Sequence, residues 1–102
     1  MDVCALVDDL MDRSRLGGVE GLRFVNCVED CLDSEVVVVD LASHADDIAD
    51  IRRIVPTARL VAFGSHVDDR ALDEALSAGA DLALPRSRLL RDPSAVIFGD
   101  RT

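Results

Sequence analysis

Three aspartates follow apolar runs at the points where buried strands are expected to end. Asp8 and Asp9 follow the run VCALV, and Asp40 directly follows the four valines of 36–39. Aspartate is rarely buried without a partner, so these carboxylates are predicted to lie at the rim of the core, only partly buried. Neighbouring carboxylates repel one another, and Mg²⁺, which prefers oxygen ligands, would offset that repulsion. The three acids therefore predict a metal site that suits phosphoryl transfer.

Helix capping is a simpler explanation of the same acids, because acidic side chains are favoured in the first turn of a helix. It suits Asp9, which opens a predicted helix. It suits Asp40 less well, because that aspartate comes directly after the four valines. The sequence therefore favours a chemical role most strongly at Asp40.

The elements that would position these acids form an alternation of apolar runs and segments with helical spacing. The runs predict strands over 3–9, 22–26, 35–41, 58–64 and 81–85. The segments between them predict helices over 10–18, 27–34, 45–55 and 68–79. This alternation indicates a parallel sheet with helices on both faces and right-handed crossovers. Strands of such a sheet are buried on both faces, which explains four valines in a row.

The carboxyl ends of parallel strands meet at one edge of the sheet, where ligands bind in folds of this kind. His44 and His66 both follow strands that end there. Together with Asp8 and Asp40 they could form a transition-metal site, so a metal-dependent hydrolase or phosphatase is one alternative. A single loop histidine is more often an exposed bystander. The full set predicted at this edge is Asp8 and Asp9, Asp40, Gly64 with Ser65 and His66, and Arg86 with Ser87.

Length and composition indicate one globular domain. The chain has 102 residues, of which 49% are hydrophobic and 30% charged. Twenty acids outnumber 11 bases, all of them arginine, and the net charge of −9 argues against binding to nucleic acid or anionic membranes. No apolar run approaches the roughly 20 residues of a membrane span, and the N-terminus lacks the basic region of a signal peptide. A cytoplasmic location is expected.

Cys4, Cys27 and Cys31 are predicted to be reduced thiols, because an odd number of cysteines in an unsecreted domain disfavours a disulfide framework. Cys27 and Cys31 stand one helical turn apart. Metal binding would need two further ligands nearby, and the local sequence supplies none. The pair is therefore predicted to be half-buried and to pack as small hydrophobic groups.

The segments ALVDD, VVVVDL, LVAFGS, AGAD and LPRS, in this order, resemble the receiver domain of bacterial response regulators over about residues 3–88. The resemblance implies a flavodoxin-like three-layer α/β/α sandwich with a five-stranded parallel sheet in the order 2-1-3-4-5. It also implies that Asp8 and Asp9 help to bind Mg²⁺ and that Asp40 accepts a phosphoryl group from a histidine kinase. Residues 1–102 are expected to form a single receiver-like domain, with 89–102 as a tail or short broken helix.

Two pocket positions depart from the receiver pattern. Gly64 stands where the family has threonine or serine, with Ser65 one residue later, and Arg86 stands where the family has lysine. Arginine is a forked and permanently charged group that could hold a phosphate with two hydrogen bonds. It could equally lie across Asp40 or Asp9 as a fixed salt bridge. The sequence leaves both arrangements open.

The predicted helices also differ from the family, because the first two are short and the fifth is truncated or broken at Pro93. These departures favour a divergent, stand-alone pseudo-receiver that signals through protein contact, since this sequence contains no output domain. A working phosphoacceptor at Asp40 with Mg²⁺ is the alternative. A shortened fifth helix is expected to leave Leu84, Leu89 and Leu90 exposed beside the fourth helix and fifth strand. That face is predicted to bind a second copy or a partner protein.

Overall fold

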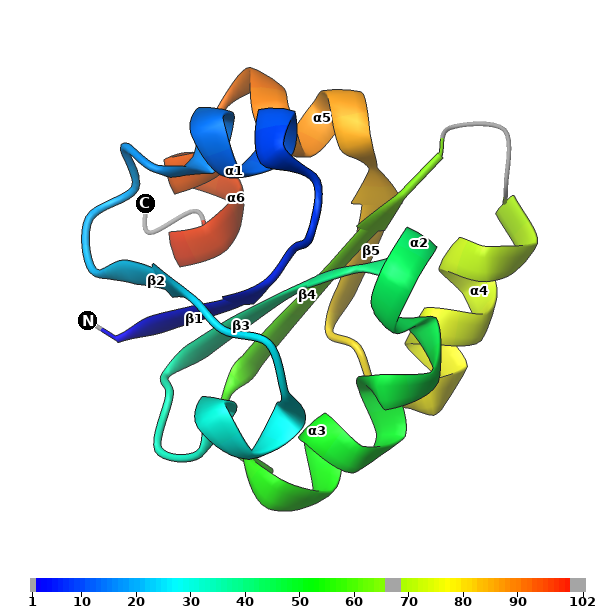
Figure 1. The fold of residues 1–102 in the computed structure, drawn as a ribbon. Coiled ribbons are helices and arrows are strands. Elements are labelled where there is room, and N and C mark those ends of the chain that lie inside the picture. The colour runs from blue at the N-terminus through cyan, green and yellow to red at the C-terminus, as the bar shows by residue number, and fades with distance from the viewer. Residues whose placement is uncertain (1, 66–68, 100–102) are drawn as a thin grey trace.

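The computed structural model describes residues 2–65 and 69–99, and within these a five-stranded parallel sheet forms the centre of the molecule (Figure 1). The strands are β1 (Val3–Leu6), β2 (Leu22–Phe24), β3 (Val36–Asp40), β4 (Arg59–Gly64) and β5 (Leu82–Pro85). Their order, β2-β1-β3-β4-β5, and their parallel pairing confirm the predicted flavodoxin-like sheet.

The central strand is β3, and its valines are buried as the sequence predicts. They pair with β1 on one side and with β4 on the other. All four are buried, because helices cover both faces of the sheet. Branched side chains of this type fit the pleated surface of a sheet well. The strand therefore carries Asp40 from the middle of the core to the carboxyl edge of the sheet.

Helices cover the sheet on both faces, which gives the predicted three layers (Figure 1). One face carries α1 (Leu10–Leu16), α5 (Arg86–Arg91) and α6 (Pro93–Phe98). The other carries η1 (Val28–Cys31), α2 (Leu41–His44), η2 (Ala45–Asp47), α3 (Ile48–Ile54) and α4 (Asp69–Ala78). Each face buries its own apolar cluster. The first cluster includes Val3, Ala5, Leu16, Val38, Phe63, Leu89 and Ile97, and the second includes Cys4, Leu6, Cys31, Val39, Ile51 and Leu72.

Residues 86–98, which include most of the segment expected as a tail or short broken helix (89–102), form two short helices. Helix α5 starts directly after β5, and α6 starts at Pro93. Proline is favoured in the first turn of a helix, where its missing N–H needs no partner. Asp92 caps α6 by accepting a hydrogen bond from the Ala95 N–H at 3.3 Å. The proline that predicts a broken fifth helix therefore separates two helices that both pack on the sheet.

The apolar patch expected beside the fifth strand does not form. Leu84 and Leu89 are buried and Leu90 is half-buried, because α5 packs against β4 and β5. Within the described residues, no helix is long and apolar enough to cross a membrane. The large hydrophobic side chains exposed in that part of the chain are instead Leu10, Met11, Leu32 and Leu76.

Candidate functional site

Asp40 ends β3 and directly precedes a helical turn, so its side chain is held inside the edge of the sheet. Only 2% of this side chain is exposed, so the predicted partial burial is wrong. Its Oδ1 accepts a hydrogen bond from the Ala42 N–H at 3.0 Å and thereby caps α2. The capping role, which the sequence favours less at this position, is therefore present. The carboxylate is covered because α2 begins at the next residue, Leu41.

Arg86 supplies the positive charge beside Asp40. It is the first residue of α5, and its guanidinium reaches across to α1 and β3. Its Nε donates to Asp12 Oδ2 at 3.0 Å, and its Nη2 lies 3.8 Å from Asp40 Oδ1, a distance of ion pairing rather than hydrogen bonding. The guanidinium also lies over the Phe63 ring, 5.7 Å from its centroid. One cation therefore faces two carboxylates.

Asp12 is the member of this cluster that the sequence reasoning missed. It lies in α1, and only 7% of its side chain is exposed. Asp12 and Leu16 are the two buried residues of that helix. Their spacing of four residues places both on one face of the helix. The sequence signal for Asp12 is an acid on the apolar face of a short helix, four residues before Leu16. An acid that is buried on such a face needs a cation beside it.

Burial and Arg86 act on Asp40 in opposite directions. Removal from water raises the pKa of the Asp40 carboxyl, because it penalises the charged form. The Ala42 N–H and the Arg86 guanidinium lower this pKa, and the nearby Asp12 raises it. The pKa stays above its ordinary value of 3.8, so the guanidinium offsets only part of the cost of burying the charge.

Asp8 and Asp9, the other predicted metal ligands, make different contacts. The Oδ1 of Asp9 accepts hydrogen bonds from two N–H groups in the first turn of α1, at 2.9 and 3.0 Å. Asp8 is exposed and lies 3.2 Å from His44 Nε2. Across the described part of the chain, no three His, Cys, Asp or Glu side chains are grouped to hold a metal ion. This arrangement does not fit Mg²⁺, since Asp9 caps a helix and a guanidinium faces Asp40.

His44 bridges two carboxylates at the same edge. Its Nδ1 lies 2.9 Å from Asp47 Oδ2, and its Nε2 lies 3.2 Å from Asp8 Oδ1. Burial lowers the pKa of this imidazole, but the two hydrogen-bonded carboxylates raise it and outweigh burial. The histidine therefore links the end of β1 to η2 as an ion-paired bridge. His66, the second histidine of the hydrolase alternative, lies outside the described residues.

Replacement of His44 by glutamine is expected to destabilise the protein more at acidic than at alkaline pH. The pKa of His44 is higher in the folded protein than its unfolded value of 6.5. The ion pairs of His44 therefore stabilise the protein fully below pH 6.5, and this stabilisation is lost as the pH rises through the folded-state pKa. The expected loss below that value is up to about 1 kcal/mol, as for other ion pairs near a surface. Urea denaturation of both proteins between about pH 5.5 and 8.5 measures it, and a pH-independent difference would contradict the bridge.

Gly64 and Ser65 lie at the end of β4, beside this cluster. A Cβ atom at Gly64 would lie 3.5 Å from two side-chain carbons of Leu41 and 3.8 Å from Leu72, which is ordinary van der Waals contact. A side chain at this position would therefore point towards α2 and α4. Ser65 lines a surface groove between α1 and α5 whose wall also includes Arg86. The Arg86 side chain is 37% exposed.

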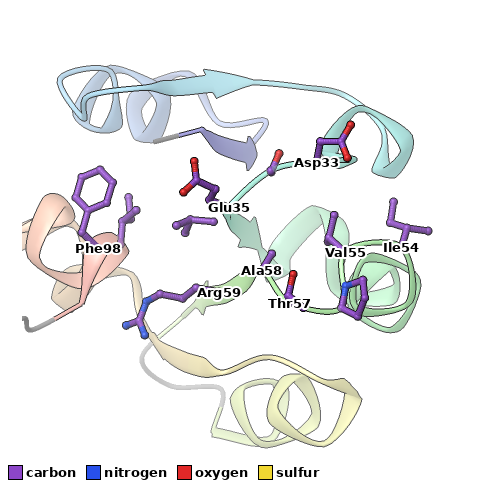
Figure 2. A pocket seen from close by; sticks show the side chains of 12 residues that line it. Asp33, Glu35, Ile54, Val55, Thr57, Ala58, Arg59 and Phe98 are labelled. Carbon is purple, nitrogen blue, oxygen red and sulfur yellow. The ribbon is translucent and has the colours of Figure 1, made fainter.

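A second hollow lies at the opposite edge of the sheet, where β3 and β4 begin. Figure 2 shows its lining, which comes from the segments before these two strands and from α6. Glu35 and Thr57 stand on the strand side, and Phe98 stands on the helix side. The hollow shares no lining residue with the groove beside Arg86. It is therefore separate from the cluster around Asp40.

Solved structures of response regulators share this fold. A response regulator protein from Burkholderia pseudomallei, with a phosphorylated aspartic acid, a calcium ion and citrate, matches with a TM-score of 0.76 and 18% identity, over 95% of this chain and 66% of that one. A response regulator receiver domain protein from Clostridium thermocellum has a TM-score of 0.71 and 20% identity, over 96% and 92%. The BeF3-activated receiver domain of DrrB from Thermotoga maritima has a TM-score of 0.68 and 19% identity, over 88% and 91%.

No protein-family model matches the chain, and no curated protein matches its sequence. The likeness to the three solved structures is one of fold, since their sequence identities to this chain are low. The chain has the fold of response regulator receiver domains, as its sequence motifs predict.

Proposed function

We propose that this chain is a receiver-like signalling module whose phosphoacceptor pocket is held shut by Arg86. One observation carries the proposal: a single guanidinium lies 3.0 Å from Asp12 and 3.8 Å from Asp40. The receiver fold supports a signalling role. By its resemblance to the receiver motif, VVVVDL implies that Asp40 corresponds to the family's phosphoacceptor. In this proposal the module acts through contact with a partner protein and not as an enzyme.

The charges around Asp40 are already paired within the protein. The Burkholderia protein contains a phosphorylated aspartic acid and a calcium ion, and the DrrB domain is activated by BeF3. In this chain the positive charge beside Asp40 is the guanidinium of Arg86, which also binds Asp12. An incoming anionic group would have to compete with Asp12 for that guanidinium. The burial of Asp40 opposes reaction further, because a phosphodonor must reach the carboxylate.

The residue at position 64 supports the same proposal. The receiver family, by the resemblance, has a hydroxyl here that bonds the phosphoryl group, and glycine has none. A Cβ at Gly64 would face Leu41 and Leu72. A pocket without this hydroxyl and with its carboxylate already ion-paired is poorly suited to holding a phosphoryl group.

The partner surface that we propose is the face formed by α4, β5 and the tail. Within the described part of the chain, α4 contributes one large exposed apolar side chain, that of Leu76. A second copy of this chain or another protein, including a histidine kinase, could bind there. This face is smaller in apolar area than the sequence predicts, because Leu84 and Leu89 are buried.

Beryllofluoride and a small acyl phosphate, each with millimolar Mg²⁺, test the closed pocket. We expect no Asp40-dependent change in the amide NMR spectrum and no phosphoryl adduct in the intact mass. Asp40→Asn is the control, because asparagine can still cap α2 while it lacks the charged carboxylate. Spectral changes around residue 40 that disappear in this variant would overturn the proposal. They would establish the alternative, a working phosphoacceptor at Asp40.

Arg86→Lys is the matched variant that keeps the positive charge. Lysine carries one compact ammonium and cannot present a fork to two carboxylates. If the fork closes the pocket, the lysine variant responds to beryllofluoride where the wild-type protein does not. A lysine variant as inert as the wild type would assign the closed state to the burial of Asp40 instead of the guanidinium.

A further inference from the structure

Two buried thiols face each other beneath η1. Cys4 lies in β1, Cys31 ends η1, and their Sγ atoms are 2.8 Å apart. Both side chains are fully buried, and neither forms a disulfide. A disulfide bond is about 2.05 Å long, so the two sulfur atoms need to approach by less than about 1 Å. The packing of η1 on β1 thus brings together two cysteines that are 27 residues apart in sequence.

Arg23 gives this thiol pair an electropositive neighbour. It pairs with Cys4 across the β1–β2 register and is held by Asp2, whose Oδ1 lies 3.0 Å from its Nε. The hydrogen bond with Cys31 lowers the pKa of Cys4, and Arg23 acts in the same direction against burial. The same hydrogen bond, together with burial, raises the pKa of Cys31. We assign the attack on an oxidant to Cys4, because it is the sulfur whose neighbour on the adjacent strand is Arg23.

We propose that Cys4 and Cys31 form a reversible disulfide site for peroxide-class oxidants, and that oxidation fastens η1 to β1. This inference is independent of the proposed signalling role, because it involves no group of the Asp40 cluster. Its basis is the direct contact of two thiols from different elements in one buried position.

The chemistry balances with one molecule of hydrogen peroxide. The Cys4 thiolate attacks one peroxide oxygen, an S–O bond forms, the O–O bond breaks, and the departing hydroxide takes up the Cys4 proton as water. The Cys31 sulfur then attacks the Cys4 sulfenic acid, an S–S bond forms and the S–O bond breaks. The hydroxide released from this S–O bond takes up the Cys31 proton and leaves as a second water. Two thiols lose two electrons, and the peroxide is reduced to two waters.

Access to the pair is limited, and Cys27 does not compete for it. Cys27 is exposed, and its hydrogen bond to Asp30 Oδ2 at 3.0 Å raises the pKa of its thiol, which reduces the share of the reactive thiolate. The oxidant reaches Cys4 and Cys31 when η1 opens. That element is one short 3₁₀ turn without a side-chain cap, which makes local opening feasible. Oxidation is therefore slow, and its rate follows the opening of η1.

The full chain carrying Cys27→Ser tests the site, because it retains only the two buried thiols. Serine can keep the hydrogen bond to Asp30, so the variant is expected to fold. The protein is treated with hydrogen peroxide, blocked with N-ethylmaleimide in denaturant, and analysed by intact mass and peptide mapping. We expect a monomer that takes up no maleimide, a linked pair of Cys4 and Cys31 peptides, and reversal by dithiothreitol. A disulfide between Cys4 and Cys31 closes the chain between them into a loop, which is expected to raise the Tm by about 10 °C or more.

Each other outcome counts against the site. Sulfinic or sulfonic acids on separate cysteines, disulfides between molecules, or thiols that stay reduced while the same protein oxidises in urea would overturn the proposal. The wild-type chain provides a second check, since its three cysteines allow three pairings. A predominant link from Cys27 to either other cysteine would also overturn it.

Discussion

Replacement of Arg86 by methionine is expected to lower the free energy of unfolding at pH 7 by about 2–3 kcal/mol. Removal of one partner from a fully buried ion pair costs about 3–5 kcal/mol, because the remaining charge lacks a counter-ion. The Arg86 side chain is 37% exposed, so solvent screens part of this loss. Asp12 and Asp40 would be left as two buried carboxylates beside each other. Methionine keeps an apolar contact with Phe63, and urea denaturation measures the difference.

Arg53→Met is the control for this experiment. Arg53 also pairs with an aspartate, at 2.9 Å from Asp50, but 74% of its side chain is exposed, and pairs of this kind contribute about 0–1 kcal/mol. Acidic pH provides a second test. The Arg86→Met variant leaves Asp40 with a pKa raised further above 3.8, so protonation relieves the loss as the pH falls through that raised value. Equal losses in the two variants, or a loss independent of pH, would contradict the shared-cation arrangement.

The strand ends of the site could be predicted because parallel sheets place them at one edge. The sequence predicts Asp40 and Arg86 there, and a salt bridge from Arg86 is one of the two arrangements that it leaves open. Asp12 was not expected, because its role depends on how α1 turns its short buried face towards α5. The covering of Asp40 was also missed. It depends on α2 starting at Leu41, without the loop that a strand end usually has.

The sheet was the most predictable part of the fold, since continuous apolar runs and strict alternation restrict the topology strongly. Local helix geometry was less predictable. The segment expected as a helix over 27–34 contains a 3₁₀ turn. The segment expected as one helix over 45–55 is divided into η2 and α3, and α2 precedes it. The tail, for which the sequence allows either an irregular segment or a short broken helix, is broken at Pro93 into α5 and α6. Tertiary packing of Leu89 and Ile97 on the sheet decides its conformation.

Replacement of Ile97 by alanine is expected to lower the free energy of unfolding by about 2–4 kcal/mol. Ile97 is fully buried on α6 and belongs to the apolar cluster that contains Phe63 and Leu89. Truncation of a buried isoleucine to alanine costs about 2–5 kcal/mol, through lost burial and the cavity left behind. Ile97 also borders the hollow at the amino edge of the sheet (Figure 2), where the structure can relax into the space, so the upper end is not expected. Chemical denaturation monitored by circular dichroism measures the change.

Leu10→Ala is the matched control, because it also shortens an aliphatic side chain on a short helix, yet 78% of Leu10 is exposed. Its expected effect is within about 0.5 kcal/mol. Equal effects at the two positions would show that α6 is not docked on the sheet. The hydrogen bond from Arg59 Nη2 to the Val96 carbonyl, at 3.0 Å, also holds α6 on this face. If the Ile97 variant releases α6, amide hydrogen exchange should increase first in residues 86–98, which would expose Leu89 and create the apolar patch that the sequence predicts.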